Sequence, residues 1–129
     1  MAVQLLNVPG LSPPPGYSHL AIGSGGKLVF TAGQVPLDAR GEIVGQGDHT
    51  TQTEQVLRNL LAALEVAGAT PSDVVKTTVY VVGGYEAQIA VWEVVRSSPI
   101  GRAPSTLIGI ELLGYRDQLV EIEAVAVIE

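Results

Sequence analysis

The chain has 129 residues, of which 47% are hydrophobic and 16% are charged, and its formal net charge is −6. This length fits a single domain over residues 1–129, and the acidic balance without any run of lysine or arginine argues against a nucleic-acid groove. Cysteine is absent and the only histidines are His19 and His49, so we expect no disulfide, no thiol nucleophile and no metal site.

The composition also bears on location and assembly. The N-terminus lacks the pattern of a signal peptide, and no apolar run approaches the ~20 residues of a membrane span, so we expect a cytoplasmic protein without membrane contact. Charged residues are fewer than the ~25% usual for soluble domains, and the mean hydropathy is +0.33. Two explanations stay open: apolar surface buried between subunits, or a monomer rich in alanine and valine.

The first part of the chain predicts an extended arm followed by a β-hairpin. Residues 1–16 end in a proline-rich stretch that excludes a helix, because proline supplies no backbone donor. Strands are expected over residues 18–22 and 27–32, joined by the glycine-rich turn 23–26. Residues 33–36 then break the second strand.

A long helix follows, with both ends marked in the sequence. Thr51 and Glu54 fit a capping box, in which the threonine bonds forward to an orphan amide and the glutamate reaches back. Apolar residues recur at helical spacing from Val56 to Ala67, and Gly68 provides a left-handed stop.

The second half of the chain predicts a strand, a helix and two further strands. The strand covers residues 73–82 and the helix residues 85–97, with an apolar face that comprises Tyr85, Ile89 and Trp92. Residues 102–110 and 120–126 form the last two strands. The expected element order is therefore ββαβαββ, an α+β fold with a mixed sheet and both helices on one face.

The last strand is the first place to look for chemistry. Its residues alternate strictly, so Val120 and Ile122 point one way while Glu121 and Glu123 point the other. Two carboxylates on a strand otherwise so apolar require partners, water or a ligand.

The order of several motifs resembles the Rid family of small proteins (YjgF-like, named for reactive-intermediate deaminases). The resemblance runs from about residue 10 to the C-terminus and rests on these segments: 15–18 (PGYS), 30–36 (FTAGQVP), 52–60 (QTEQVLRNL), 74–80 (VVKTTVY) and 120–126 (VEIEAVA). It implies a chorismate-mutase-like sheet with two helices, three copies closing into a homotrimeric barrel, and ligand clefts between subunits. The activity it implies is cofactor-free hydrolysis of 2-imino or 2-enamino acids.

The resemblance also implies a set of site residues. Tyr17 stands where the family has an aromatic residue, and Glu121 matches the family's acid, which positions water or relays a proton. The other positions depart from the family: Ser105 replaces the arginine that holds the substrate carboxylate, Ala32 replaces a serine, and Ile89 replaces an asparagine. Three polar groups that would grip an imino acid are thus small or apolar here.

Arg102 is the candidate that could replace the missing arginine. An earlier start of the strand, or a bulge at residues 103–104, would let its guanidinium reach the same cleft, and the alternative is a surface arginine paired with an acid of another subunit. Lys76 is expected to extend to water. Gly109 lies beside the cleft, where its amide could serve a ligand oxyanion.

Three functions remain in competition. The leading hypothesis is a homotrimer that binds a small metabolite bearing a carboxylate or an imine, with the deaminase activity weakened or lost. The second is an active enamine or imine deaminase that uses Arg102 or takes a different substrate class. The third, a ribonuclease or translation inhibitor, is disfavoured by the acidic charge.

Overall fold

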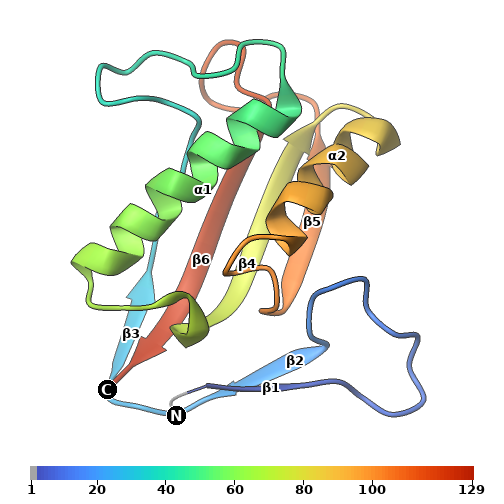
Figure 1. The fold of residues 1–129 in the computed structure, drawn as a ribbon, viewed down its shortest axis with the longest axis vertical. Coiled ribbons are helices and arrows are strands. Elements are labelled where there is room, and N and C mark those ends of the chain that lie inside the picture. Colours follow the sequence, from blue (N-terminus) through green and yellow to red (C-terminus); the bar gives the residue numbers. More distant parts are fainter. Residues whose placement is uncertain (1–2) are drawn as a thin grey trace.

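The computed structural model describes residues 3–129. Figure 1 shows the elements in this range, which in chain order are β1 (Val3–Leu6), β2 (Leu20–Gly23), β3 (Lys27–Phe30), α1 (His49–Val66), the short 3-10 helix η1 (Pro71–Asp73), β4 (Val74–Val82), α2 (Tyr85–Arg96), β5 (Ser105–Ile110) and β6 (Val120–Ile128). No helix within this part of the chain is long and apolar enough to cross a lipid bilayer.

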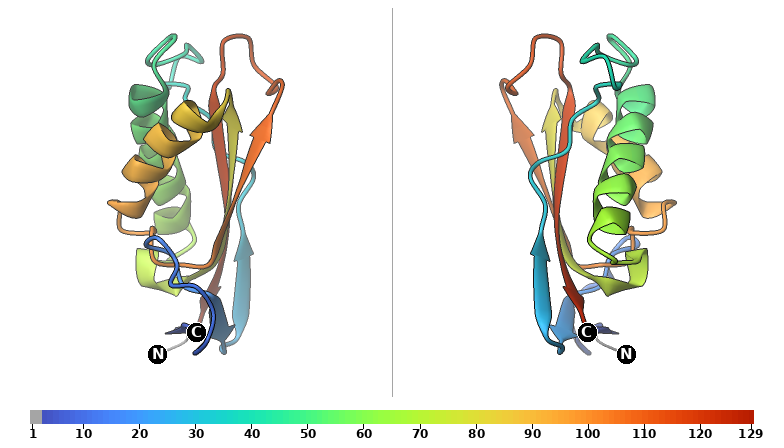
Figure 2. Two further views of the ribbon diagram at one scale, coloured as in Figure 1. Left: turned by 90° about the vertical axis from the view of Figure 1, so that its right-hand side faces the viewer. Right: turned by 90° about the vertical axis from the view of Figure 1, so that its left-hand side faces the viewer.

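The larger sheet is mixed and has the strand order β3-β6-β4-β5. Strand β6 pairs antiparallel with β3 and β4, whereas β4 and β5 run parallel. Both helices lie on the same face of this sheet, as the edge-on views in Figure 2 show. The α+β class, the mixed sheet and the placement of the helices expected from the sequence are confirmed. The expected order ββαβαββ is incomplete, because part of the predicted extended arm forms β1, which pairs with β2.

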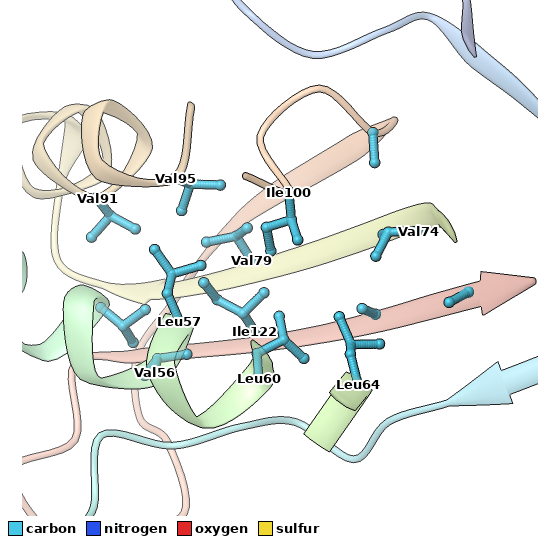
Figure 3. Close-up of a cluster of buried hydrophobic side chains, with 14 of the residues drawn as sticks. Val56, Leu57, Leu60, Leu64, Val74, Val79, Val91, Val95, Ile100 and Ile122 are labelled. Carbon is cyan, nitrogen blue, oxygen red and sulfur yellow. The ribbon is translucent and has the colours of Figure 1, made fainter. Parts of the chain in front are cut away.

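The core lies between the helices and the sheet (Figure 3). It is formed by buried side chains from both helices, the central strands and the loop after α2, among them Val56, Leu57, Leu60, Leu64, Val74, Val79, Val91, Val95, Ile100 and Ile122. Fully burying one such side chain contributes about 1.5–3 kcal/mol. The alternation predicted for the last strand is confirmed, since Val120 and Ile122 are buried here while Glu121 and Glu123 lie on the face that the helices leave open.

The predicted hairpin between residues 18–22 and 27–32 is wrong. Strand β2 pairs with β1 in a separate two-stranded antiparallel sheet, and β3 pairs with β6. The chain separates the two strands at its glycine turn, where Gly23 and Gly25 pack closely against Val127 of β6. A Cβ on Gly23 would lie 2.9 Å from Val127 Cγ2, so the turn crosses the end of β6 and carries β2 away from the main sheet.

The predicted start of the first helix is three residues late. The N-cap is Asp48, whose carboxylate accepts from the Thr51 amide at 3.2 Å and from the Thr51 hydroxyl at 2.8 Å. Asp48 can cap because aspartate is as good an N-cap as threonine, and it uses the threonine predicted for that role as its own partner. The predicted stop is confirmed, since Gly68 has φ +80° after the last helical turn.

Candidate functional site

The two glutamates of β6 face away from the helices and lie beside Tyr80 of β4. The Tyr80 hydroxyl donates to Glu123 Oε1 at 3.0 Å, and Tyr80 and Glu121 are paired across the two strands. The bond to the Glu123 carboxylate, followed by burial and the charges of both glutamates, raises the pKa of Tyr80 above its usual value. This phenol therefore stays a hydrogen-bond donor at neutral pH.

Glu121 is held in place from two sides. Gln118 Nε2 donates to Glu121 Oε1 at 3.0 Å. On the other side the carboxylate occupies the space above Gly33, where a Cβ would lie 2.6 Å from Glu121 Cδ and 2.8 Å from its Cγ. A side chain at position 33 would therefore displace the Glu121 carboxylate. Ala32 is the residue next to this contact. The structure thus brings together Glu121 and the segment containing Ala32.

Sequence reasoning missed the buried amides that support Glu121. The Gln118 side chain is 3% exposed, and its Oε1 accepts from the Tyr115 amide at 3.1 Å. Behind it, the fully buried Gln52 of α1 accepts from the Leu119 amide at 2.8 Å and donates to the Asp117 carbonyl at 3.0 Å. The role of Gln52 depends on partners more than 60 residues away in the sequence, and that of Gln118 depends on the local turn that brings its amide back to Glu121, so no sequence pattern marks either glutamine.

Ser105 lies on the opposite face of the sheet from Glu121. Its hydroxyl oxygen accepts from Thr77 Oγ1 at 2.8 Å, and Thr77 is 1% exposed on the helix side. Ser105 lines a cavity of about 260 Å³ together with Pro15, Tyr17, Trp92 and Leu107. The structure therefore brings Ser105 and Tyr17 together, and it separates both from Glu121 within one chain.

This cavity continues along α2. A second cavity of about 260 Å³ shares Pro15, Trp92 and Leu107 with the first one. Its further lining residues all belong to α2 and are Tyr85, Gln88, Ile89, Glu93 and Arg96. We call the two cavities together the α2 groove. Ile89 thus lies in the same groove as Ser105. Gly109 packs against the side-chain amide of Gln88, which a Cβ at position 109 would displace.

The aromatic pair in the α2 groove ties the N-terminal arm to the helix. Trp92 Nε1 donates to the Pro15 carbonyl at 2.8 Å, and the rings of Tyr17 and Trp92 meet edge to face with centroids 5.9 Å apart. The sequence placed Trp92 on an apolar helix face but gave no sign that it binds the arm.

The two other basic candidates lie outside the α2 groove. Arg102 is exposed and lines a separate cavity of about 530 Å³, to which Val3 and Leu5 of β1 also contribute. Lys76 lies on the open face of the sheet, where Nζ donates to Thr106 Oγ1 at 2.6 Å. Residues 3–129 contain no group of three or more histidine, aspartate or glutamate side chains arranged to hold a metal ion.

Comparisons with known proteins place these features in a family. A family model described as Endoribonuclease L-PSP matches residues 10–128. A RutC family protein of Pyrococcus horikoshii is 40% identical over 103 residues, which is 78% of this chain and 79% of that protein. A 2-iminobutanoate/2-iminopropanoate deaminase of Salmonella typhimurium is 43% identical over 56 residues, which is 43% of each chain.

A solved structure extends the match to the whole fold. The structure of YyfB from Yersinia pestis, a protein of unknown function of the conserved Rid protein family, superposes with a TM-score of 0.92 at 37% identity and covers 99% of this chain and 100% of that one. The fold is therefore that of the small α+β domains found in Rid proteins. The chain belongs to the Rid family, which also carries the names YjgF, RutC and L-PSP.

Proposed function

We propose that this protein is a homotrimer that binds a small metabolite in clefts between subunits, with the 2-imine deaminase activity of its relatives weakened or lost. The observation that carries this proposal is the position of Ser105. It lies in the α2 groove beside Tyr17, and by our alignment it replaces the arginine that would hold a substrate carboxylate.

The separation of the candidate residues supports assembly. Ser105 and Tyr17 lie on the helix side of the sheet, whereas Glu121 lies on the open face, so one chain cannot bring them around a single ligand. A neighbouring copy could place its Glu121 beside the groove. The open face also exposes large apolar side chains, which favours burial between subunits: Leu28 (63% exposed), Phe30 (70%), Ile108 (40%) and Ile110 (39%).

The chemistry explains why position 105 matters. Hydrolysis of a 2-imino acid adds water across the C=N bond, and the resulting carbinolamine releases ammonia to leave a 2-oxo acid. A carboxylate such as Glu121 can accept the proton of the attacking water, and an arginine holds the substrate carboxylate through two parallel bonds. A serine hydroxyl offers one neutral donor. Hydrogen bonds to charged groups contribute about 1.5–3 kcal/mol, so losing the arginine should slow the reaction by about tenfold to a hundredfold.

The test compares imine hydrolysis in a coupled assay, with an amino-acid oxidase as the source of 2-imino acids. The wild-type protein should accelerate hydrolysis little. Ser105→Arg should raise the rate, and adding Ala32→Ser and Ile89→Asn should raise it further. Ser97→Arg is the matched control, because it adds the same charge at an exposed site outside the α2 groove. A folded triple variant with no gain would contradict the alignment of this corner.

Assembly has its own measurement. The protein should sediment as a trimer, near three times the chain mass of 13.4 kDa. A monomer at every concentration would remove the cleft between subunits and the proposal with it.

The second candidate function is an active deaminase that uses Arg102. The location of Arg102 does not favour this alternative, since Arg102 lines a cavity that shares no residue with the α2 groove. Wild-type rates that match an arginine-bearing relative and fall with Arg102→Ala would establish it. The family description also contains the word endoribonuclease, but a net charge of −6 does not favour RNA binding.

A further inference from the structure

Helix α2 carries a second stripe of residues that does not face the core. Tyr85, Ile89, Trp92 and Arg96 recur at i, i+4, i+7 and i+11 and therefore share one side of the helix. Tyr85 and Ile89 are 83% and 61% exposed, whereas the core-facing residues of α2 are Val91 and Val95. The exposed stripe is apolar and aromatic along its length and ends in a cation.

The N-terminal arm packs on this stripe and places Arg96 at the end of the α2 groove. Gly16 follows the proline that binds Trp92 and has φ +108°. A Cβ at Gly16 would lie 3.2 Å from Arg96 Cβ and 3.3 Å from Arg96 Nε. Glycine is required at this position both by the left-handed backbone and by the close approach of the arginine stem. The contact holds the Arg96 stem against the arm.

The charges of the groove single out this arginine. Among the described residues that line the α2 groove, Arg96 is the one cation and Glu93 the one acid. Their closest atoms, Arg96 Nη1 and Glu93 Oε1, are 3.7 Å apart, with the two side chains 42% and 61% exposed. An exposed pair at this distance is weak. A ligand carboxylate can therefore compete for the guanidinium, which offers several donors in a fixed plane.

We infer that Arg96 is the anion anchor of the α2 groove and that the ligand is a carboxylate with a planar apolar body. The body lies along Trp92, Ile89 and Leu107, where an aromatic ring finds stacking and dispersion contacts. The carboxylate binds the Arg96 guanidinium. Ser105 completes the site, because its oxygen accepts from Thr77 and its own proton is available to donate.

This inference rests on the proposed small-molecule cleft and changes where the ligand is held. The anchor moves from strand β5, where position 105 is a serine, to the last turn of α2. The isoleucine at position 89 then suits the same ligand, because the part of the groove between Ser105 and Arg96 contacts the apolar body of the ligand and requires no amide.

The chain contains its own reporter for the test, since Trp92 is its single tryptophan. Phenylacetate and the neutral phenylacetamide are the probes, titrated into the intact protein while the tryptophan fluorescence is recorded, with calorimetry as the second measurement. Phenylacetate should bind about tenfold or more tightly than phenylacetamide, because a charge-assisted bidentate contact is lost in the amide. Arg96→Gln should abolish this preference, and Glu93→Gln should strengthen it.

Arg58→Gln is the matched control, since Arg58 lies on α1 and bonds only Gln55 among the described side chains. It should leave the preference unchanged. Equal affinity for the two probes in the wild type, or a preference that survives Arg96→Gln, would overturn the anchor and leave the proposed cleft intact. If 2-oxobutyrate binds and neither aromatic probe does, the ligand class is overturned in the same way. If none of the three compounds binds, the proposed metabolite site is overturned as well.

Discussion

Replacing Gln118 by leucine should destabilise the protein, because a buried amide with three partners would be lost. Gln118 donates to the Val120 carbonyl at 3.1 Å and to Glu121 at 3.0 Å, and it accepts from the Tyr115 amide at 3.1 Å. A neutral hydrogen bond contributes about 0.5–1.5 kcal/mol and one to a charged group about 1.5–3 kcal/mol. Glu121 is half-buried, which favours the lower figures, and the leucine regains part of the loss by apolar burial. We expect the free energy of unfolding to fall by about 2–4 kcal/mol.

Urea unfolding followed by circular dichroism measures this change, at one fixed protein concentration because subunit dissociation contributes to the stability of an oligomer. Gln46→Leu is the matched control. Gln46 also bonds the segment before β6, through Asp117 Oδ2 at 3.2 Å, but it is exposed, so its replacement should change the stability by less than about 0.5 kcal/mol. Equal losses in the two variants would refute the reasoning that the buried amide holds this segment.

The same replacement should act on catalysis wherever catalysis can be measured. In the Ser105→Arg protein, Gln118→Leu should lower kcat while leaving KM nearly unchanged, because Gln118 fixes Glu121 and does not line the groove that binds the substrate. A rise in KM with constant kcat would show that Gln118 acts on binding.

Two further predictions concern pH. The hydroxyl of Thr51, and then its amide, lower the pKa of Asp48. Asp48 therefore stabilises the fold above its unfolded pKa of about 3.9, and this contribution is lost as the pH falls through the lower folded value. Asp48→Asn should flatten the acid side of a curve of melting temperature against pH. The hydrogen bond to Glu123 raises the pKa of Tyr80. The contribution of Tyr80 to folding stability is present below about pH 10 and is lost as the pH rises through the folded value. An ultraviolet absorbance titration should show one late-ionising tyrosine that is absent in Tyr80→Phe.

The sequence predicts those parts of the fold that depend on short-range patterns. The alternation of β6 identifies the buried side of the strand and the side that bears Glu121, and the apolar spacing of α1 identifies a helix that ends at Gly68. Pairing of distant segments is not encoded in this way. The sequence of Leu20–Gly23 is compatible with pairing either to β1 or to β3. The packing of the glycine turn on Val127 decides in favour of β1.

The candidate site shows the same division. Residue type and motif order identify Tyr17, Ser105 and Glu121 as candidates. They do not show that Ser105 and Glu121 lie on opposite faces, since this depends on how β5 and β6 register against β4. Nor do they identify Arg96, because its place in the groove depends on an arm that lies 80 residues away in the sequence.

The position of β6 in the sheet has a consequence for how the protein folds. β6 follows the other described strands in sequence order, yet it lies inside the sheet between β3 and β4, so neither of these strands is fully paired until β6 has joined them. The pairing of Lys27 with Ile128 closes almost the whole length of the chain. Contacts so distant in sequence slow folding, and until β6 pairs they leave β3 and β4 with unpaired edges. The sheet should therefore form late in folding, and β6 must complete it before the exposed apolar strands meet those of other chains.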